Sequence, residues 1–362
     1  MARILMKGNE AMAEAAIQAG CQAFFGYPIT PQSEIPEYFA RELPPRGGLF
    51  LQAESEMAAM NMVMGASAAG GRVMTSTSGP GYCLKLEALA AMALTRLPAV
   101  VVVVMRSGPA FGTMKAAQED YRMTGNGGYK AVTFAPSDVQ EAAAMVYEAF
   151  DIADQYRNPV VIMADGMIGQ MMGAVDFDKM PAKRMNLPEK TWALRGSASR
   201  GGENSAILFP VGPAHYAAKH EAEAELYPAL IANETQVEVD GVEDADLVLV
   251  AYGTAAKMCR AAAEELRGRV KIGIIRPKTI WPFPYGAFEK IGKNCKAIIC
   301  PEINIIGQMI DDVRIAAAGR WPVHHVGDTA GDFLTPENII EKAEQVWKEV
   351  QACVSCLKNP NP

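Results

Sequence analysis

The sequence predicts an α/β protein with a doubly wound parallel sheet and a second, smaller α/β unit. Over residues 1–165, short segments rich in β-branched residues alternate with longer helical segments, the pattern of a parallel sheet covered by helices on both faces. Residues 98–105 include five consecutive valines, which predict a strand buried on both faces. The alternation fades at residue 166 and resumes at Asp246, where the second unit is expected to begin.

The elements of the first unit follow from composition and from helix signals. Strands are expected at 21–26, 49–52, 73–76, 98–105, 131–134 and 160–164, and helices at 10–19, 56–69, 82–95 and 137–156. Asn9 is the expected N-cap of the first helix, and Gly20 is expected to end it in the left-handed conformation. Thr30 is expected to cap the next helix, with Pro31 at its first position.

The second half of the chain is expected to hold a connector and then a regular unit. Residues 166–240 lack a clear period, which predicts irregular structure over much of that stretch. Strands are then expected at 247–252, 271–275, 297–300 and 323–326, and helices at 255–266 and 285–292, before Gly319 and from Thr335. We therefore expect domains at 1–180 and 241–350, a connector at 181–240 and a tail at 351–362.

Composition and charge argue against two classes of function. Of the 362 residues, 50% are hydrophobic, and 34 Lys and Arg face 41 Asp and Glu. A net charge of −7 argues against a nucleic-acid partner. The longest apolar run, 98–105, is too short to span a bilayer, and the N-terminus lacks the apolar core of a signal peptide. We expect no membrane association and a cytoplasmic location.

The cysteines and histidines predict no metal site in this chain. Seven cysteines are scattered, mostly in apolar segments, as expected of reduced thiols. One Cys-x-x-Cys pair, Cys353 and Cys356, cannot supply four ligands alone, and its role stays open. The four histidines show no spacing typical of metal ligands.

Polar residues follow several predicted strands, which is where open α/β sheets bind ligands. They lie at 27–30, at 52–56, at 75–81 and at Arg106. A dinucleotide site is disfavoured because Leu84 stands where the third glycine of the phosphate-binding fingerprint belongs, and Pro80 removes one N–H group. A tight strand-to-helix turn is the simpler interpretation of these glycines.

Glu54, Glu56 and Arg106 are the candidate ionisable residues. The two acids precede an apolar helix, where a buried acid would be poorly solvated and suited to proton exchange. A solvated acid there would only stabilise the helix N-terminus. Arg106 follows the most apolar strand and needs an anion, either an internal carboxylate or a substrate. The residues alone leave these alternatives open.

The same positions carry a resemblance to a known family. The chain resembles the α subunit of 2-oxoacid:ferredoxin oxidoreductases at Tyr27-Pro-Ile-Thr-Pro31, Gln52-Ala-Glu-Ser-Glu-Met-Ala-Ala59, the strand ending in Arg106, and Arg276-Pro-Lys-Thr-Ile-Trp-Pro-Phe-Pro284. The resemblance implies a thiamine diphosphate pyrimidine-binding domain and a smaller domain similar to the C-terminal domain of transketolase. The opening Met6-Lys-Gly-Asn-Glu10 is most similar to the branched-chain (3-methyl-2-oxobutanoate) enzymes.

The resemblance implies a role for each of four residues. Glu56 matches the glutamate that hydrogen-bonds N1′ of the aminopyrimidine; it is preferred to Glu54 because small residues and a glycine follow it as in the family. Pro28 lies in the cofactor-facing loop. Thr30 matches the threonine whose hydroxyl approaches the substrate, and Arg106 matches the arginine that receives the substrate carboxylate.

The resemblance also implies what other chains supply. The Gly-Asp-Gly motif that holds Mg²⁺ and diphosphate has no match, because Asp165-Gly166 follows alanine and Gly327-Asp328 precedes threonine. A β subunit would therefore carry Mg²⁺, the diphosphate and a [4Fe-4S] cluster. A γ subunit and a ferredoxin-like δ subunit complete the expected complex, with ferredoxin as electron acceptor, coenzyme A as acyl acceptor and an anaerobic host.

Two alternatives remain at this point. The substrate could be 2-oxoglutarate or pyruvate, because Lys115 and Arg122 could supply the second cation that a dicarboxylate needs. The chain could instead be a non-catalytic doubly wound adaptor or electron-transfer subunit, in which Glu56 and Arg106 are structural. Subunit stoichiometry and the coenzyme A contacts are not fixed by the sequence.

Overall fold

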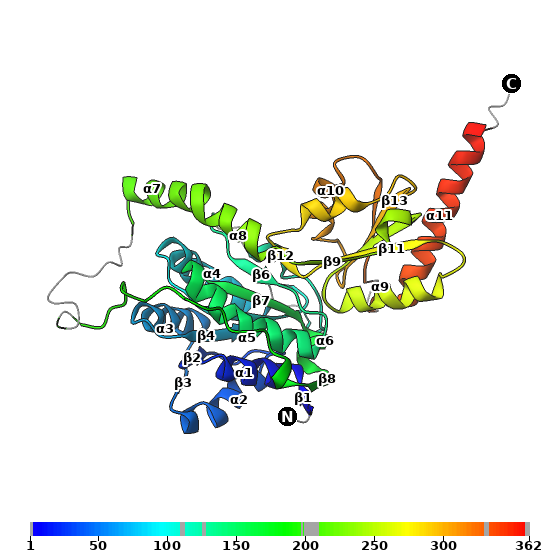
Figure 1. Ribbon diagram of the computed structural model, residues 1–362. Coiled ribbons are helices and arrows are strands. Elements are labelled where there is room, and N and C mark those ends of the chain that lie inside the picture. Colours follow the sequence, from blue (N-terminus) through cyan, green and yellow to red (C-terminus); the bar gives the residue numbers. More distant parts are fainter. Residues whose placement is uncertain are drawn as a thin grey trace. The chain divides into compact units, whose positions relative to one another are not determined.

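The computed structural model describes residues 3–108, 113–124, 128–196, 198, 210–328 and 333–358, with side chains as far as Ala352. The chain divides into two compact units, Met1–Thr235 and Gln236–Pro362. Each is a sheet with helices packed on it (Figure 1). Among the described segments, no helix is both long and apolar enough to cross a membrane.

The central sheet of the first unit is parallel and runs in the order β6-β7-β5-β4-β2-β3. Its strands are β2 (Ala23–Gly26), β3 (Leu49–Gln52), β4 (Val73–Thr77), β5 (Val100–Met105), β6 (Val132–Phe134) and β7 (Val160–Asp165). Every residue of β5 is fully buried, as the valine run predicted. A β-branched strand in mid-sheet packs helices on both faces, so β5 forms the centre of the core.

The chain order of the strands fixes the face that each helix covers. The helices are α1 (Gly8–Gln18), α2 (Glu34–Glu42), α3 (Glu56–Ala68), α4 (Gly79–Leu94) and α5 (Val139–Tyr156). Right-handed crossovers from β2 to β3 and from β4 to β5 run in opposite directions and put α2 and α4 on opposite faces. Accordingly, α1 packs on α2 and α5, whereas α3 packs on α4. The doubly wound fold is confirmed.

This connectivity places a topological switch point between β2 and β4. Neighbouring connections leave these two strands in opposite directions, so the loops after their carboxyl ends separate and open a crevice. The segments at that edge are Tyr27–Thr30 after β2 and Ser78–Gly79 after β4. The sheet topology therefore selects the motif residues 27–30 as ligand-facing, independently of any resemblance.

The second unit is a smaller sheet in the order β14-β13-β10-β11-β9, parallel except for β9. Its strands are β9 (Val237–Asp240), β10 (Leu247–Val250), β11 (Ile272–Pro277), β13 (Ala297–Pro301) and β14 (Val323–Val326), and its helices are α9 (Gly253–Glu265), α10 (Ile310–Ala317) and α11 (Pro336–Lys358). Residues expected as a helix at 285–292 form a 3₁₀ helix, Tyr285–Lys290, and Thr279–Trp281 is the short strand β12.

The connector and the tail differ from the sequence expectation. Within 181–240 the chain forms α7 (Pro213–Glu221), a π-helical turn (Ala222–Leu226) and α8 (Tyr227–Glu234). Prolines in this stretch suggested irregular structure, but Pro213 lies in the first turn of α7, where a missing N–H group costs no hydrogen bond. Pro228 follows the π-helical turn within a continuous helical run. The last helix, α11, continues through most of 351–362.

Two local expectations near the N-terminus also need correction, and one strand there was not expected. The segment before α1 forms β1 (Ile4–Lys7), which pairs antiparallel with β8 (Met172–Val175). Lys7, not Asn9, is the N-cap of α1. Helix α2 starts at Glu34, so Thr30 does not cap it, because the loop makes a further turn in which the Gln32 N–H donates to the Ile29 carbonyl.

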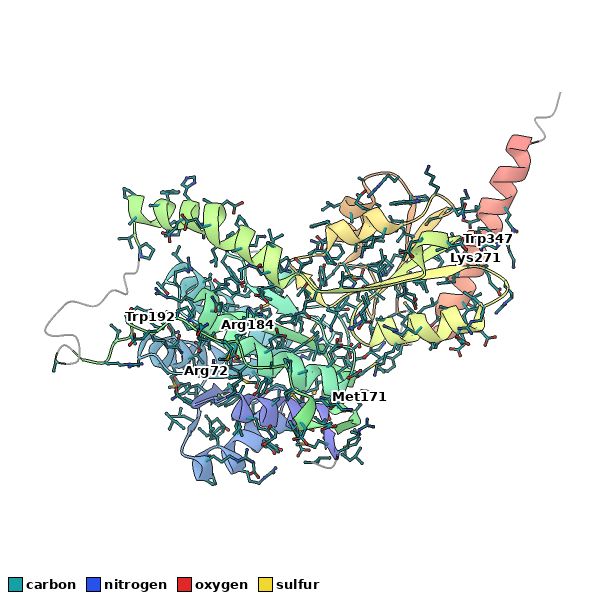
Figure 2. The ribbon with its side chains drawn as sticks, viewed as in Figure 1. Arg72, Met171, Arg184, Trp192, Lys271 and Trp347 are labelled. Carbon is teal, nitrogen blue, oxygen red and sulfur yellow. The ribbon has the colours of Figure 1, made fainter. Side chains whose placement is uncertain are left out.

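Two half-buried arginines, Arg72 and Arg184 (labelled in Figure 2), form ion pairs with acids of α5 and α8. Arg184 binds the Glu234 carboxylate with two hydrogen bonds of 2.7 Å, and its backbone N–H donates to Asp151 at 2.9 Å. Glu234 is 1% exposed, and its hydrogen bonds raise the pKa of Arg184 above the ordinary value. Arg72 likewise lies between Asp151 and Asp154 of α5, with an Nε–Oδ2 distance of 2.8 Å to Asp154.

Replacing Arg184 by methionine is expected to destabilise the first unit by about 2 kcal/mol, because Glu234 is left as a buried carboxylate without its cation. Urea unfolding followed by circular dichroism measures the change. The double variant Arg184→Met/Glu234→Leu is the control and should recover most of the loss, since it removes both charges. An equal loss in the single and double variants would contradict this account of the ion pair.

Candidate cofactor and substrate site

Glu56 lies in the first turn of α3, at the carboxyl edge of the sheet. The Ser55 hydroxyl caps this helix by accepting the Ala58 N–H at 3.2 Å, which fixes where the helix starts. The Glu56 side chain is 7% exposed, whereas Glu54 is exposed. Within the described part of the chain, no hydrogen bond reaches the Glu56 carboxylate. A buried acid with open acceptor sites is therefore held at this edge.

Gly81 allows the first turn of α4 to close on Glu56. A Cβ atom at Gly81 would lie 2.6 Å from Glu56 Oε1 and 2.4 Å from Thr77 Oγ1, so any side chain there would force Glu56 and Thr77 to move. The sequence analysis interpreted this glycine as part of a tight strand-to-helix turn. The structure shows the additional reason for it, which is the close approach of α4 to the acid.

Lys85, one turn further along α4, is fully buried behind Glu56. Its Nζ donates to the main-chain oxygen of Glu56 at 3.3 Å and to Thr75 Oγ1 at 3.1 Å. Burial lowers the pKa of the Lys85 amine to about 8, against the opposing attraction of Glu56. Both hydrogen-bond acceptors are neutral oxygens, so the lysine fixes the backbone at the start of α3 without forming a close ion pair.

The loop after β2 is held from several sides. Side-chain amides of Asn9 and Gln170 both donate to the Pro31 carbonyl at 2.7 Å. Buried Gln32 donates to the Tyr27 carbonyl at 3.2 Å and accepts a hydrogen bond from the Ser76 hydroxyl. Loops that carry ligand-binding groups gain precision when their backbone is fixed in this way. Asn9, which was expected to cap a helix, thus positions this loop.

Arg106 brings the ends of β2 and β5 together. Its Nη1 donates to the Thr30 carbonyl at 2.8 Å, so the guanidinium lies against the loop that carries Thr30 and Pro28. Both Pro28 and Thr30 are exposed, and Arg106 is half-buried. Three of the four site residues expected from sequence therefore lie at one edge of the sheet, with Glu56 at the start of the neighbouring helix.

Several buried polar atoms at this edge have no hydrogen-bond partner within the described residues: Thr77 Oγ1, Ser78 Oγ, Arg106 Nε and Asp120 Oδ1. Thr77 is the last residue of β4, Ser78 follows it as the N-cap of α4, and Arg106 follows β5. An unpaired buried polar atom costs about 1–3 kcal/mol, so a cluster of them indicates a polar ligand. The cluster coincides with the switch point of the sheet.

Asp120 is a site residue that sequence reasoning missed. It is fully buried, and its Oδ2 accepts the Gly79 N–H, the first of α4, at 3.3 Å. Burial raises the pKa of the Asp120 carboxyl to about 7, against the opposing effects of the Gly79 and Arg106 N–H groups and the Arg106 charge. Nothing in the sequence distinguishes Asp120 from its neighbour Glu119. Lys85, by contrast, lies in a mostly apolar helix whose only other charged residue is Glu87, which was a usable signal.

Residues weighed for other roles lie elsewhere. Lys115 and Arg122 are half-buried, and the Arg122 guanidinium lies over the Tyr121 ring at 5.7 Å; both already interact within the chain. Asp165 caps the short helix Gly166–Gln170 by accepting the Ile168 N–H at 3.2 Å. The part of the structure that is described holds no cluster of three or more His, Cys, Asp or Glu able to bind a metal ion. The side chains of Cys353 and Cys356 lie outside the described residues.

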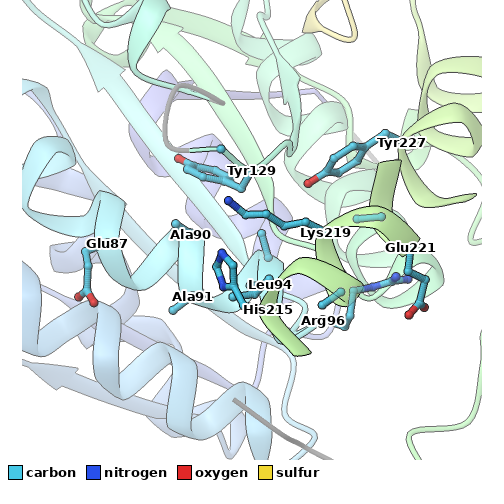
Figure 3. A pocket seen from close by; sticks show the side chains of 14 residues that line it. Glu87, Ala90, Ala91, Leu94, Arg96, Tyr129, His215, Lys219, Glu221 and Tyr227 are labelled. Atoms are coloured by element: carbon cyan, nitrogen blue, oxygen red, sulfur yellow. The ribbon is translucent and has the colours of Figure 1, made fainter. Parts of the chain in front are cut away.

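A cavity of about 210 Å³ lies between α4 and the segment 215–227 (Figure 3). Ala90, Ala91 and Leu94 of α4 form its apolar wall, and Tyr129 and Tyr227 contribute aromatic rings. None of the four predicted site residues lines it. The crevice at the switch point, with its unpaired polar atoms, therefore remains the candidate site.

Comparisons with known proteins give the class of the first unit, which is a thiamine diphosphate-binding domain. The family model described as "Pyruvate flavodoxin/ferredoxin oxidoreductase, thiamine diP-bdg" matches residues 14–229. "Pyruvate:ferredoxin oxidoreductase core domain II" matches residues 245–339. The chain belongs to this 2-oxoacid:ferredoxin oxidoreductase family, as the sequence motifs predicted.

Curated relatives cover almost the whole chain. The ketoisovalerate oxidoreductase subunit VorB of Methanothermobacter marburgensis is 38% identical, over 96% of this chain and 99% of that protein. The 2-oxoglutarate synthase subunit KorA of the same organism is 33% identical, over 93% and 97% of the two chains. Both the expected branch and its alternative are thus represented among the relatives.

Solved structures agree with the fold of both units. The 2-oxoglutarate:ferredoxin oxidoreductase of Magnetococcus marinus, solved with 2-oxoglutarate, coenzyme A and succinyl-CoA bound, matches with a TM-score of 0.82 at 28% identity. The match covers 95% of this chain and 65% of that one. A split-gene transketolase matches with a TM-score of 0.60 at 17% identity and shows the fold alone.

Proposed function

We propose that this chain is the α subunit of a thiamine diphosphate-dependent oxidative decarboxylase that converts 2-oxo acids and coenzyme A to acyl-CoA and passes electrons to ferredoxin. The observation that carries the proposal is the buried carboxylate of Glu56, which has open acceptor sites at the start of α3. If the chain were a non-catalytic adaptor, the unpaired buried polar atoms at this edge of the sheet would have no explanation.

The residues present fit the aminopyrimidine half of the cofactor. Glu56 offers a carboxylate in a low-dielectric setting, and Gly81 leaves space beside it that a Cβ atom would fill. When bound, thiamine diphosphate supplies the carbanion chemistry that releases carbon dioxide from a 2-oxo acid. Glu56 holds and exchanges the proton at the pyrimidine N1′, and Lys85 keeps its backbone in place. Pro28 lies in the loop that faces the cofactor.

Arg106 and Thr30 form the proposed substrate subsite. An arginine binds a carboxylate through two parallel, charge-assisted hydrogen bonds, and Arg106 has only one of its groups engaged with the Thr30 carbonyl. The Thr30 side chain is exposed on the loop held by Asn9 and Gln170, so its hydroxyl can approach the 2-oxo group.

The substrate class is a branched-chain 2-oxo acid such as 3-methyl-2-oxobutanoate. The relatives with 38% identity are named ketoisovalerate oxidoreductase subunits, compared with 32–34% for the 2-oxoglutarate synthase subunits. A dicarboxylate would need a further cation, and Lys115 and Arg122 already have interactions within the chain. The 2-oxoglutarate enzyme stays the second candidate because those relatives are also close.

Partner subunits complete the proposed enzyme. Helices α3 and α4 are mostly apolar, and Met57 is 55% exposed and Leu84 is 48% exposed, so part of this surface suits a protein partner. We assign that face to a β subunit that carries the diphosphate, Mg²⁺ and a [4Fe-4S] cluster. A γ subunit and a ferredoxin-like δ subunit complete a cytoplasmic complex of anaerobic metabolism.

Substituting Arg106 by methionine is expected to raise KM for 2-oxo acids about 10- to 100-fold, because a charge-assisted pair is worth about 1.5–3 kcal/mol. The assay is viologen reduction by the reconstituted complex with coenzyme A and a panel of 2-oxo acids. Wild-type enzyme should prefer 3-methyl-2-oxobutanoate. A higher rate with 2-oxoglutarate would overturn the substrate assignment, and an unchanged KM in Arg106→Met would overturn the subsite.

A further inference from the structure

Asp120 caps helix α4, but buried polar atoms around it remain without hydrogen-bond partners in the described chain. Ser78 occupies the N-cap position of α4, but its hydroxyl makes no capping hydrogen bond and has no partner among residues the structure describes. The first N–H of the helix is instead taken by Asp120, from a loop forty-one residues later in the chain. Only one carboxylate oxygen is used, and Oδ1 is buried without a partner in the described segments.

Asp120 and Arg106 flank the same glycine. Gly79 has a φ of +40°, and a Cβ atom there would lie 3.1 Å from Arg106 Nε and 3.0 Å from the Gly108 carbonyl. The glycine therefore lets the guanidinium approach the same turn that Asp120 holds. Arg106 Nε is itself buried and unpaired within the described chain. A carboxyl group, Asp120, and a guanidinium cation, Arg106, therefore lie at the turn formed by Gly79, and each has one hydrogen-bonding atom without a partner in the described chain.

We propose that Asp120 is a positioning residue that sets the net charge around Arg106, so that a 2-oxo acid carboxylate binds well when Asp120 is protonated and poorly when it is ionised. This inference rests on the substrate role proposed above for Arg106. A protonated Asp120 leaves the guanidinium charge available to the substrate. An ionised Asp120 offsets that charge and repels the incoming carboxylate.

Three neighbouring groups affect the ionisation of Asp120. Arg106, at the end of β5, favours the ionised form, and Glu119 of the same loop disfavours it. The Gly79 N–H, at the start of α4, also favours the ionised form, but desolvation outweighs these effects. Tyr82 and Cys83 of α4 are affected by the charge of Asp120 in turn. Burial thus raises the pKa of Asp120 to about 7, which places the change within the working range of an enzyme.

The test is the pH dependence of KM and kcat for the reconstituted complex between about pH 6 and pH 8. Wild-type KM for the 2-oxo acid should rise roughly tenfold across this range while kcat changes little, because a carboxylate charge near Asp120 shifts its ionisation by at least about one pKa unit. Asp120→Asn should keep the low-pH KM throughout. Glu119→Gln, the neighbouring acid, is the matched control and should retain the wild-type dependence.

A wild-type measurement covers the case in which Asp120→Asn does not fold. Inhibition by the neutral amide of the 2-oxo acid should be independent of pH, whereas inhibition by a non-reacting carboxylate analogue should weaken as pH rises. Equal pH dependence for both inhibitors, or an unchanged KM profile in folded Asp120→Asn, would overturn the inference. If Arg106→Met leaves KM unchanged, the proposed substrate subsite is wrong. If Arg106→Met raises KM but Asp120→Asn retains the wild-type pH dependence, only the role proposed for Asp120 is wrong.

Discussion

Replacing Glu56 by glutamine is expected to lower kcat of the reconstituted complex about 10²- to 10⁴-fold, the usual contribution of a positioned acid–base group. Glutamine keeps the size of the side chain and can accept a hydrogen bond, but it cannot exchange a proton with N1′ of the pyrimidine. Because the Glu56 carboxylate makes no hydrogen bond within the described part of its own chain, the fold should tolerate the change. Viologen reduction with a saturating 2-oxo acid measures the effect.

Glu54→Gln is the matched control for this prediction. Glu54 lies two residues earlier and is exposed, so the same chemical change there should leave kcat within about twofold of wild type. Circular dichroism of both variants checks that the fold is intact. Retained activity in Glu56→Gln, with the loss appearing in Glu54→Gln, would mean that the catalytic acid has been assigned to the wrong glutamate.

Replacing Lys85 by methionine is expected to remove a pH-dependent part of the stability. In the unfolded chain a lysine keeps its proton to about pH 10.5, whereas burial lowers the pKa of Lys85 in the folded chain to about 8. Between these values the unfolded state binds more protons, so the wild-type free energy of unfolding rises with pH, by on the order of 3 kcal/mol in total. The variant should lack this rise.

Urea unfolding of the isolated chain at about pH 7.5 and pH 10 measures the Lys85 contribution as a difference between wild type and variant, so that other groups cancel. Lys183→Met, at an exposed lysine of the same unit, should keep the wild-type pH dependence. If Lys85→Met and wild type gain stability equally over this interval, the amine is charged when buried and the desolvation account is wrong.

The sequence predicted the sheet of the first unit closely because its strands and helices differ sharply in composition. The valine run of β5 and the strand-to-helix transitions near Ser55 and Gly79 carry their signals locally. By contrast, β1 and β8 pair with each other although most of the sequence of the first unit lies between them. Neither short segment has a composition that predicts a strand. Helices α7 and α8 were missed because their prolines were interpreted as breaks in structure.

The site was predictable only where function uses a residue type that is unusual for its position. Glu56 and Arg106 were found because each interrupts an apolar context. Asp120 was not, because it lies in a polar loop and becomes significant only when the fold buries it beside Gly79. The loop contacts of Asn9 and Gln170 with Pro31 are long-range as well, and they appear only once β2 and β7 lie in one sheet.

The central claim is that Glu56 acts on the aminopyrimidine ring of the cofactor. Exchange of the thiamine diphosphate C2 proton for deuterium in the complete complex, stopped by acid and read by NMR, tests it without substrate or electron acceptor. The account predicts that Glu56→Gln slows this exchange by about a hundredfold or more while the complex still contains its cofactor. Equal exchange rates in wild type and Glu56→Gln, at equal cofactor content, would contradict it.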